Sequence, residues 1–354
     1  MSKKRIIIIS IIVGVLAVIA VVLYFFTHQK TEQRKYEVSK AELSTLKKEV
    51  SISIQRYEKD LFTLNTKDLK ELGNAVAQLS KKYPKELIAA GVWEDPMMMQ
   101  QLSNYLNDPA IRDIYESTMK VFPDLNDLTD ELQDALAYYL HYYPNVEIPV
   151  FFTLVPGIDT ESPSVFGYEN HIFIHLDMYM GADSPHYKKI GIPLYISERF
   201  DKKYIAIDCF KKALVYKHLP EQTRITLLDH MIYEGKKLYF TELMFPQRTE
   251  EDLIGYTPEK YAWANQYQPE IWNYLIEKEM LFSKNEDARR KFIEEAPFTK
   301  PFTNASPGRL GAFIGWKIVQ GYMENHTELS LNDLIKNTDS QMILKESGYK
   351  PLNK

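Results

Sequence analysis

The sequence contains one cysteine in 354 residues, Cys209, which lies far from the N-terminus. One cysteine cannot form a disulfide within the chain, so cysteine usage does not identify the cellular compartment. The chain also lacks a basic block outside its N-terminus, and its formal net charge is −5. This charge balance argues against a nucleic-acid partner. There is no low-complexity tract and no internal repeat.

Several motifs of catalysis are absent. The chain has no G-x-S-x-G sequence and no glycine-rich phosphate loop, and no histidine is followed by glutamate. The last absence excludes a His-Glu-x-x-His zinc helix. Hydrolysis by zinc needs three protein ligands and an open coordination position. The sequence therefore predicts no catalytic residue, no metal and no cofactor.

An unbroken apolar run occupies residues 6–26 near the start of the chain. A helix of that length rises about 30 Å, which matches the hydrocarbon core of a bilayer. A cleaved signal peptide would have a shorter apolar region followed by a small-residue cleavage site, and the sequence Thr27-His-Gln-Lys30 is not such a site. We therefore expect residues 1–27 to form an uncleaved membrane anchor.

Basic residues flank the apolar run on both sides, so the positive-inside rule is nearly balanced. We expect the short basic tail before it to be cytoplasmic, which places the rest of the chain on the extracytoplasmic, periplasmic side. Residues 28–52 are polar with mixed charges, and we expect a stalk there. Residues 53–354 are predicted to form a single globular domain, and they suffice for a sizeable core.

Apolar periodicity predicts helices on both sides of a small sheet. The i, i+3, i+4 spacing indicates helices over 67–82, 97–120, 126–142, 204–217, 222–243, 258–283, 286–294, 308–325 and 330–337. Strand patterns occupy 148–155, 164–167 and 171–178, and they predict a three-stranded antiparallel meander. The predicted fold class is α+β, mostly helical, with a small antiparallel sheet flanked by helices.

The predicted strand 171–178 places His171, His175 and Asp177 on one face. The two histidines are about 13 Å apart along a strand, too far to share one metal ion. His175 and Asp177 are close enough to converge. A polar strand face that lines a cleft or faces solvent is the simpler interpretation, and both residues are candidate cleft residues.

The predicted helix 222–243 carries a second polar group. His230 and Glu234 are spaced i, i+4 and share one face of the helix. Gly235 follows directly, although glycine inside a helix costs about 1 kcal/mol relative to alanine. A close-packed neighbouring segment would explain this glycine.

The segment 306–323 is the most distinctive part of the sequence. Gly311 and Gly315 lie one turn apart and would make a groove for close helix packing, with a ligand site as the alternative. Arg309 opens the helix, and packing alone does not explain it. Arg309 is therefore a candidate binding residue, in addition to the His175–Asp177 and His230–Glu234 pairs.

Several stretches, in a consistent order over about residues 50 to 352, resemble the gliding-motility lipoprotein GldB family of Bacteroidota. They include Ile54-Gln-Arg-Tyr-Glu-Lys-Asp-Leu-Phe62, residues 176–181, 228–239, 254–257 and 296–298, and the segment 306–323. The resemblance implies a role in gliding and in the type IX secretion apparatus of the cell envelope. Family members are usually lipid-anchored through an N-terminal cysteine, and a helical anchor is expected here instead.

The domain also resembles a zincin-type metallopeptidase fold that has lost its site. In such peptidases a His-Glu-x-x-His helix precedes a helix with Glu-Gly, whose glutamate is the third zinc ligand. Glu234-Gly235 matches the second helix, whereas the preceding helix, which contains the candidate Asp208, has no histidine. The resemblance implies that another donor replaces the metal beside Glu234. The candidates are a tyrosine hydroxyl, Lys211, Lys212, His230 and Arg309.

These expectations combine into one functional hypothesis. The protein is expected to be a non-enzymatic envelope component that supports the gliding or secretion machinery and binds a peptide or partner segment in its cleft. Its partners would be the membrane and other envelope proteins. The alternative is an active metal-dependent hydrolase whose site combines His175, Asp177, His230 and Glu234. A third interpretation is a structural domain whose cleft is closed by side chains.

Overall fold

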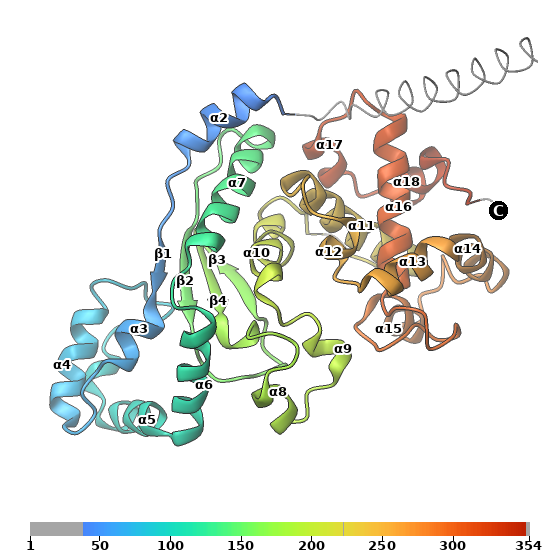
Figure 1. Ribbon diagram of the computed structural model, residues 1–354. Coiled ribbons are helices and arrows are strands. Elements are labelled where there is room, and N and C mark those ends of the chain that lie inside the picture. Colours follow the sequence, from blue (N-terminus) through green and yellow to red (C-terminus); the bar gives the residue numbers. More distant parts are fainter. Residues whose placement is uncertain (1–37, 222, 352–354) are drawn as a thin grey trace, which may run out of the picture. The chain divides into compact units, whose positions relative to one another are not determined.

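The computed structural model of the protein describes residues 38–221 and 223–351 (Figure 1). The chain divides into two compact units, Met1–Lys40 and Ala41–Lys354. The predicted anchor, residues 1–27, and the first part of the predicted stalk, residues 28–37, lie outside the described residues. Within the described part of the chain, no helix is both long and apolar enough to cross a bilayer.

The second part of the predicted stalk, residues 41–52, belongs to the larger unit. It contains most of the helix α2 (Lys40–Glu49). Lys47 of α2 forms an ion pair with Asp134 of the helix α7 (Asn126–Tyr142). The globular unit therefore begins before residue 53.

Short helices precede α7, and an aspartate side chain caps the start of three of them. The sequence predicts one helix over 97–120, but the structure has two, because Asp108 and Pro109 interrupt it. The Asp108 carboxylate accepts a hydrogen bond from the backbone N–H of Ala110 at 2.8 Å, and Pro109 has no N–H to continue the preceding helix. The elements are α3 (Tyr57–Phe62), α4 (Leu69–Leu79), η1 (Val92–Glu94), α5 (Pro96–Asn107) and α6 (Pro109–Val121).

The α+β class, mostly helical with a small sheet flanked by helices, is confirmed, but the sheet is mixed rather than antiparallel. Its four described strands have the order β1-β2-β4-β3. The β1–β2 and β2–β4 pairs are parallel, and only β3 and β4 are antiparallel. The strands are β1 (Ile54–Arg56), β2 (Val150–Leu154), β3 (Val165–Tyr168) and β4 (His171–His175).

Burial explains why the predicted meander is wrong. Phe173 and its two neighbours in β4 are fully buried, which suits a strand with a partner on each side. Tyr168 in β3 is 48% exposed, which suits an edge. The chain therefore runs from β2 to the edge strand β3, and β4 then lies between these two strands. The predicted strand over 171–178 ends at His175, and η2 (Leu176–Met178) follows.

The second half of the chain is helical and contains the longest described helix, α11. The predicted helix over 258–283 is again two helices, α13 and α14, and the short helices α8, α9, α12 and α18 were not predicted. The elements are α8 (Pro185–Lys189), α9 (Leu194–Ser197), η3 (Lys202–Tyr204), α10 (Ile205–Lys212), η4 (Leu214–Lys217), α11 (Leu227–Met244), α12 (Glu250–Ile254), α13 (Pro258–Gln266), α14 (Gln268–Glu277), α15 (Glu286–Ile293), α16 (Leu310–Asn325), α17 (Leu331–Lys336) and α18 (Ser340–Ser347).

Helices α11 and α16 pack backbone against backbone (Figure 1). A Cβ atom on Gly315 would lie 1.8 Å from the carbonyl oxygen of Met231, and a Cβ on Gly235 would lie 2.4 Å from the Gly315 backbone. Only glycine fits at such a crossing. The expected close-packed neighbour of Gly235 is therefore α16, and the packing interpretation of Gly315 is confirmed.

Candidate functional site

Glu234 lies on α11 with each carboxylate oxygen beside a cation. Its Oε1 accepts a hydrogen bond from Lys237 Nζ at 2.9 Å, and its Oε2 accepts one from Arg309 Nη2 at 3.2 Å. The three side chains are mostly buried, with 16%, 11% and 10% of their surfaces exposed, respectively. The prediction that at least one of the candidate donors lies within hydrogen-bond reach of Glu234 is confirmed, and that donor is Arg309. Lys237 was not among the predicted donors.

Arg309 bridges two carboxylates that are far apart in the sequence. Its Nη1 lies 3.4 Å from Glu295 Oε1, which also pairs with Arg199. Arg309 directly precedes α16 with φ of 58°, in the left-handed region that L residues seldom adopt. The neighbouring Gly308 carbonyl accepts a 2.6 Å hydrogen bond from the Tyr256 hydroxyl. The strained backbone is thus held in place, and it directs the guanidinium between Glu234 and Glu295.

Asp208 on α10 extends this network of buried charges. Its Oδ2 pairs with Lys212 Nζ at 2.8 Å and accepts a hydrogen bond from the Tyr179 hydroxyl at 2.7 Å. Its Oδ1 lies 3.8 Å from Lys211 Nζ, which donates to the Leu253 carbonyl at 2.8 Å. Two of the four predicted donor side chains, Lys211 and Lys212, therefore bind Asp208.

The cations keep the carboxylates of the buried Asp208 and the half-exposed Glu295 ionised. Burial alone would raise the pKa of Asp208, but Lys212, Lys211 and Arg199 outweigh it and lower that pKa to about 2. Similarly, burial would raise the pKa of Glu295, and the two arginines lower it to about 2.

Glu234 follows the same rule. Burial opposes its ionisation, and Lys237 and Arg309 more than compensate, so its pKa is below the ordinary value. Burial lowers the pKa of Lys211 well below its usual range. The cluster therefore consists of paired, ionised groups around one strongly desolvated lysine.

Three predicted site residues lie apart from this network. His230 sits one turn before Glu234, and burial, Arg224 and Arg289 lower its pKa. His175 ends β4, with its ring 5.7 Å from that of Phe166 in an edge-on contact. In the described part of the chain, no hydrogen bond or ion pair joins either histidine to Glu234.

Asp177 is also separate, in η2, and it is fully buried. Its Oδ2 accepts a hydrogen bond from the Gly157 backbone N–H at 2.8 Å, and its buried Oδ1 has no partner. Burial raises the pKa of Asp177 to about 7. Ion pairs therefore join Glu234, Arg309 and Glu295, and Asp208 interacts with this group electrostatically, through Arg199 and Lys211. His175, Asp177 and His230 lie outside this network.

Three members of the network, Arg199, Lys237 and Glu295, were not found from the sequence. Lys237 carries a local signal, because it is spaced i, i+3 from Glu234. Arg199 and Glu295 lie in loops and carry none. Among the described residues, no group of three or more histidine, cysteine, aspartate or glutamate side chains could hold a metal ion.

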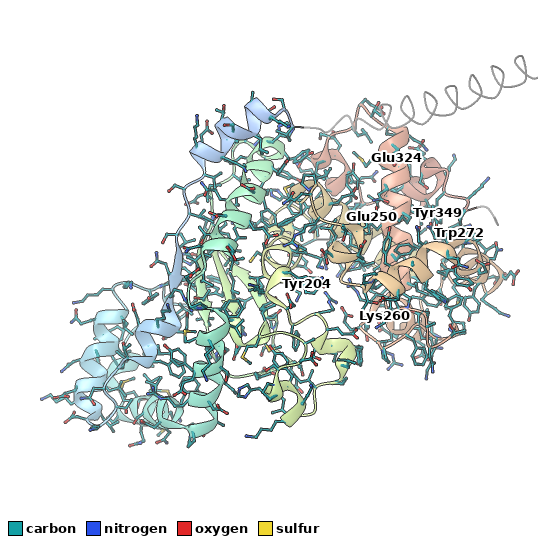
Figure 2. All side chains as sticks on the ribbon, viewed as in Figure 1. Tyr204, Glu250, Lys260, Trp272, Glu324 and Tyr349 are labelled. Carbon is teal, nitrogen blue, oxygen red and sulfur yellow. The ribbon has the colours of Figure 1, made fainter. Side chains whose placement is uncertain are left out.

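A cavity of about 220 Å³ opens beside the network, and we call it the Arg199 cavity. Arg199, Glu295 and Gly308 line it together with side chains from η3 and α13. Tyr204 and Lys260, which come from those two elements, also line it (Figure 2). The cavity therefore gives an outside ligand access to the Arg199–Glu295 pair.

Comparison with known protein families gives a match that covers nearly the whole described chain. The model of the family described as gliding motility protein GldB matches residues 37–351. Searches of curated proteins and of solved structures find no match.

Proposed function

Because the chain belongs to the gliding motility protein GldB family, we propose that it is a non-enzymatic envelope protein that binds a peptide or partner segment in the Arg199 cavity. Family membership makes it a gliding motility-related protein, and the lipoprotein type of the family indicates a membrane-anchored envelope protein. The bound segment would belong to the gliding or type IX secretion machinery. The larger unit would lie on the periplasmic side.

The pairing of Glu234 carries the non-enzymatic part of this proposal. In the zincin resemblance this glutamate would bind zinc, but here its oxygens bind Lys237 and Arg309 of the same chain. A buried carboxylate needs compensating charge, and a fixed guanidinium supplies it without a metal. We infer a degenerate peptidase-like cleft in which charge pairing has replaced catalysis.

The cavity composition supports binding of a polypeptide. Its rim carries both charge signs, since Lys260 lies 3.4 Å from Glu198 in a half-buried pair, and tyrosines line it. Tyrosine combines apolar surface with a hydrogen-bonding tip, which suits protein recognition. These features fit a partner segment better than a small apolar ligand.

Affinity purification from native envelopes, followed by mass spectrometry, tests the proposal. Lys260→Glu reverses a charge at the cavity rim, and Lys278→Glu at the exposed end of α14 is the matched control. We expect one set of envelope proteins with wild type and the control, and a depleted set with Lys260→Glu together with reduced colony spreading. Equal recovery and equal spreading by both variants would contradict binding at this cavity.

A further inference from the structure

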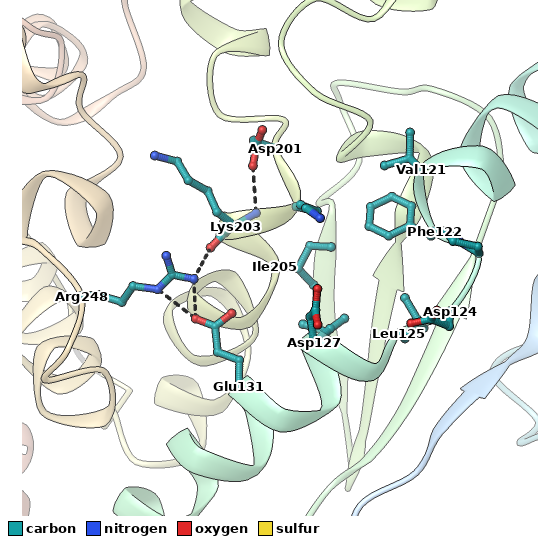
Figure 3. A pocket seen from close by; sticks show the side chains of 13 residues that line it. Val121, Phe122, Asp124, Leu125, Asp127, Glu131, Asp201, Lys203, Ile205 and Arg248 are labelled. Carbon is teal, nitrogen blue, oxygen red and sulfur yellow. Dashed lines mark hydrogen bonds and ion pairs between the residues drawn. The ribbon is translucent and has the colours of Figure 1, made fainter.

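A second cavity, of about 360 Å³, lies between the start of α7, the end of α6 and η3 (Figure 3). We call it the Phe122 cavity. Its volume is in the range of ligand pockets in proteins. Asp201 and Lys203 line both this cavity and the Arg199 cavity, so the two are neighbours. The residues of the Glu234 network do not line it.

Apolar side chains form one part of the wall of the Phe122 cavity. Phe122, Leu125 and Ile205 are nearly buried, with exposed fractions of 4%, 8% and 1%, while Val121 is 37% exposed. Figure 3 shows Val121 and Phe122 across the cavity from Arg248. An apolar wall of this size can hold one large side chain from outside, and covering Val121 would remove apolar surface from water.

The charged side chains of the wall are compensated unevenly. Arg248 forms hydrogen bonds to Glu131 at 2.6 and 2.9 Å, so this pair is neutral. Lys203 pairs with Asp252, outside the cavity, at 2.7 Å. The ammonium group of Lys203 is therefore already paired with a carboxylate that does not line the cavity.

Four other charged side chains line the cavity, the carboxylates of Asp124, Asp127 and Asp201 and the cation of Lys202. Among the described residues, the Asp124 and Asp201 side chains accept backbone N–H groups only, at 3.1 Å from Asn126 and 3.0 Å from Lys203. No ion pair of Asp127 is present among the described residues, and Lys202 is the remaining cation. The wall thus carries an excess of negative charge beside an apolar surface.

From this combination we infer that the Phe122 cavity binds a polypeptide segment in which a large apolar side chain adjoins a lysine or arginine. The apolar group would cover Val121 and Phe122, and the cation would meet Asp124 and Asp127. Val121, Asp124 and Asp127 are exposed at the surface, which leaves room for a peptide backbone across them. This inference does not depend on the function proposed for the Arg199 cavity.

Methyl NMR of the full-length chain in detergent micelles tests the inference with a defined probe, N-acetyl-Phe-Lys-amide. We expect saturable shifts of the Val121, Leu125 and Ile205 methyl signals. N-acetyl-Phe-Glu-amide should bind at least about tenfold more weakly, because its charge is repelled. Equal binding of the two dipeptides, or no shift of these signals, would overturn the inference.

Two further arms make the result specific. Asp127→Asn should weaken the Phe-Lys probe about two- to fivefold, as expected for one exposed charge pair. Asp130→Asn, an exposed change on the same helix but outside the cavity, should have no effect. Methyl signals far from the cavity report whether Asp127→Asn is folded, and Asp124→Asn replaces it if they change. Phenethylamine binding as tightly as the dipeptide would assign the cavity to small amines and reject a polypeptide ligand.

Discussion

Arg309 holds two carboxylates together, and its loss would leave both undercompensated. Glu234 would keep Lys237 and Glu295 would keep Arg199, but neither carboxylate would retain the shared guanidinium. All of these side chains except Glu295 are mostly buried, so the missing charge is poorly screened by water. Arg309 therefore stabilises the fold of the site and also compensates the negative charges of Glu234 and Glu295.

We predict that Arg309→Ala lowers the unfolding free energy by about 3 kcal/mol, a typical cost of removing one partner of a buried ion pair. Urea denaturation of the purified full-length protein measures it. The control is Arg290→Ala, which removes an arginine that is 61% exposed and paired with Asp287. It should change the free energy by at most about 0.5 kcal/mol. Equal effects of the two variants would contradict the assigned pairing.

Asp177 has the opposite electrostatic character to Asp208. Its folded pKa, about 7, lies above the unfolded value of 3.8. Between these values the folded state holds a proton that the unfolded state has lost, so the contribution to stability falls as pH rises. Above about pH 7 the cost is fully present, and below the unfolded pKa it disappears.

We predict that Asp177→Asn gains stability relative to wild type as pH rises from 5 to 8. The gain should be on the order of 2 kcal/mol, since one pKa unit corresponds to about 1.4 kcal/mol. Comparing the unfolding free energies of the two proteins at both pH values cancels the contributions of the histidines. A constant difference between variant and wild type would mean that Asp177 is ionised throughout.

At the crossing of α11 and α16 the two helix backbones approach each other closely. The Gly315 Cα lies so close to the Met231 carbonyl that no side chain fits between the helices. This contact positions Glu234, one turn after Met231, relative to Arg309, which precedes α16. Gly235 and Gly315 therefore allow the close helix crossing that positions Glu234 relative to Arg309.

We predict that Gly315→Ala costs about 3 kcal/mol or more, because overpacking exceeds the roughly 1 kcal/mol gained in helix propensity. Gly321→Ala in the same helix is the matched comparison. Its Cβ would meet the Ser347 carbonyl oxygen at 3.0 Å, a contact that a small shift relieves. Thermal unfolding of both variants should show a much larger loss for Gly315→Ala. Similar losses of stability in the two variants would show that α11 and α16 are farther apart at Gly315 than the structure places them.

Elements with a strong local pattern could be predicted from the sequence. The helix over 126–142 has its predicted bounds, because its apolar residues recur on one face for four turns. The order of the strands could not be predicted. Ile54 pairs with Phe151 across almost a hundred residues, and no local pattern encodes that pairing.

The same limit applies to the site. The sequence predicts that Glu234 has a compensating donor, because a buried carboxylate needs one, but Arg309 is only one of five candidates that it offers. Arg199 and Glu295 lie in connecting segments whose positions depend on the whole fold. His175 and Asp177 were expected to share a strand face, but the strand ends at His175 and the backbone turns into η2.

For the molecule as a whole, the proposed periplasmic placement of the larger unit leads to a prediction. Protease added to spheroplasts should digest the unit Ala41–Lys354 while a cytoplasmic marker remains intact. The reason is the basic tail before an apolar run that would span the inner membrane. Protection of this unit until the membrane is permeabilised would place it in the cytoplasm.

The most direct test of the account is colony spreading by a strain whose only copy carries His175→Gln and His230→Gln. Neither histidine belongs to the Glu234 network, so the account predicts spreading like wild type at an equal protein level, measured by immunoblot. A deletion strain, which should not spread, gives the baseline. Loss of spreading at a normal protein level would instead favour a hydrolase that uses these imidazoles. It would contradict a non-enzymatic role for this chain in gliding.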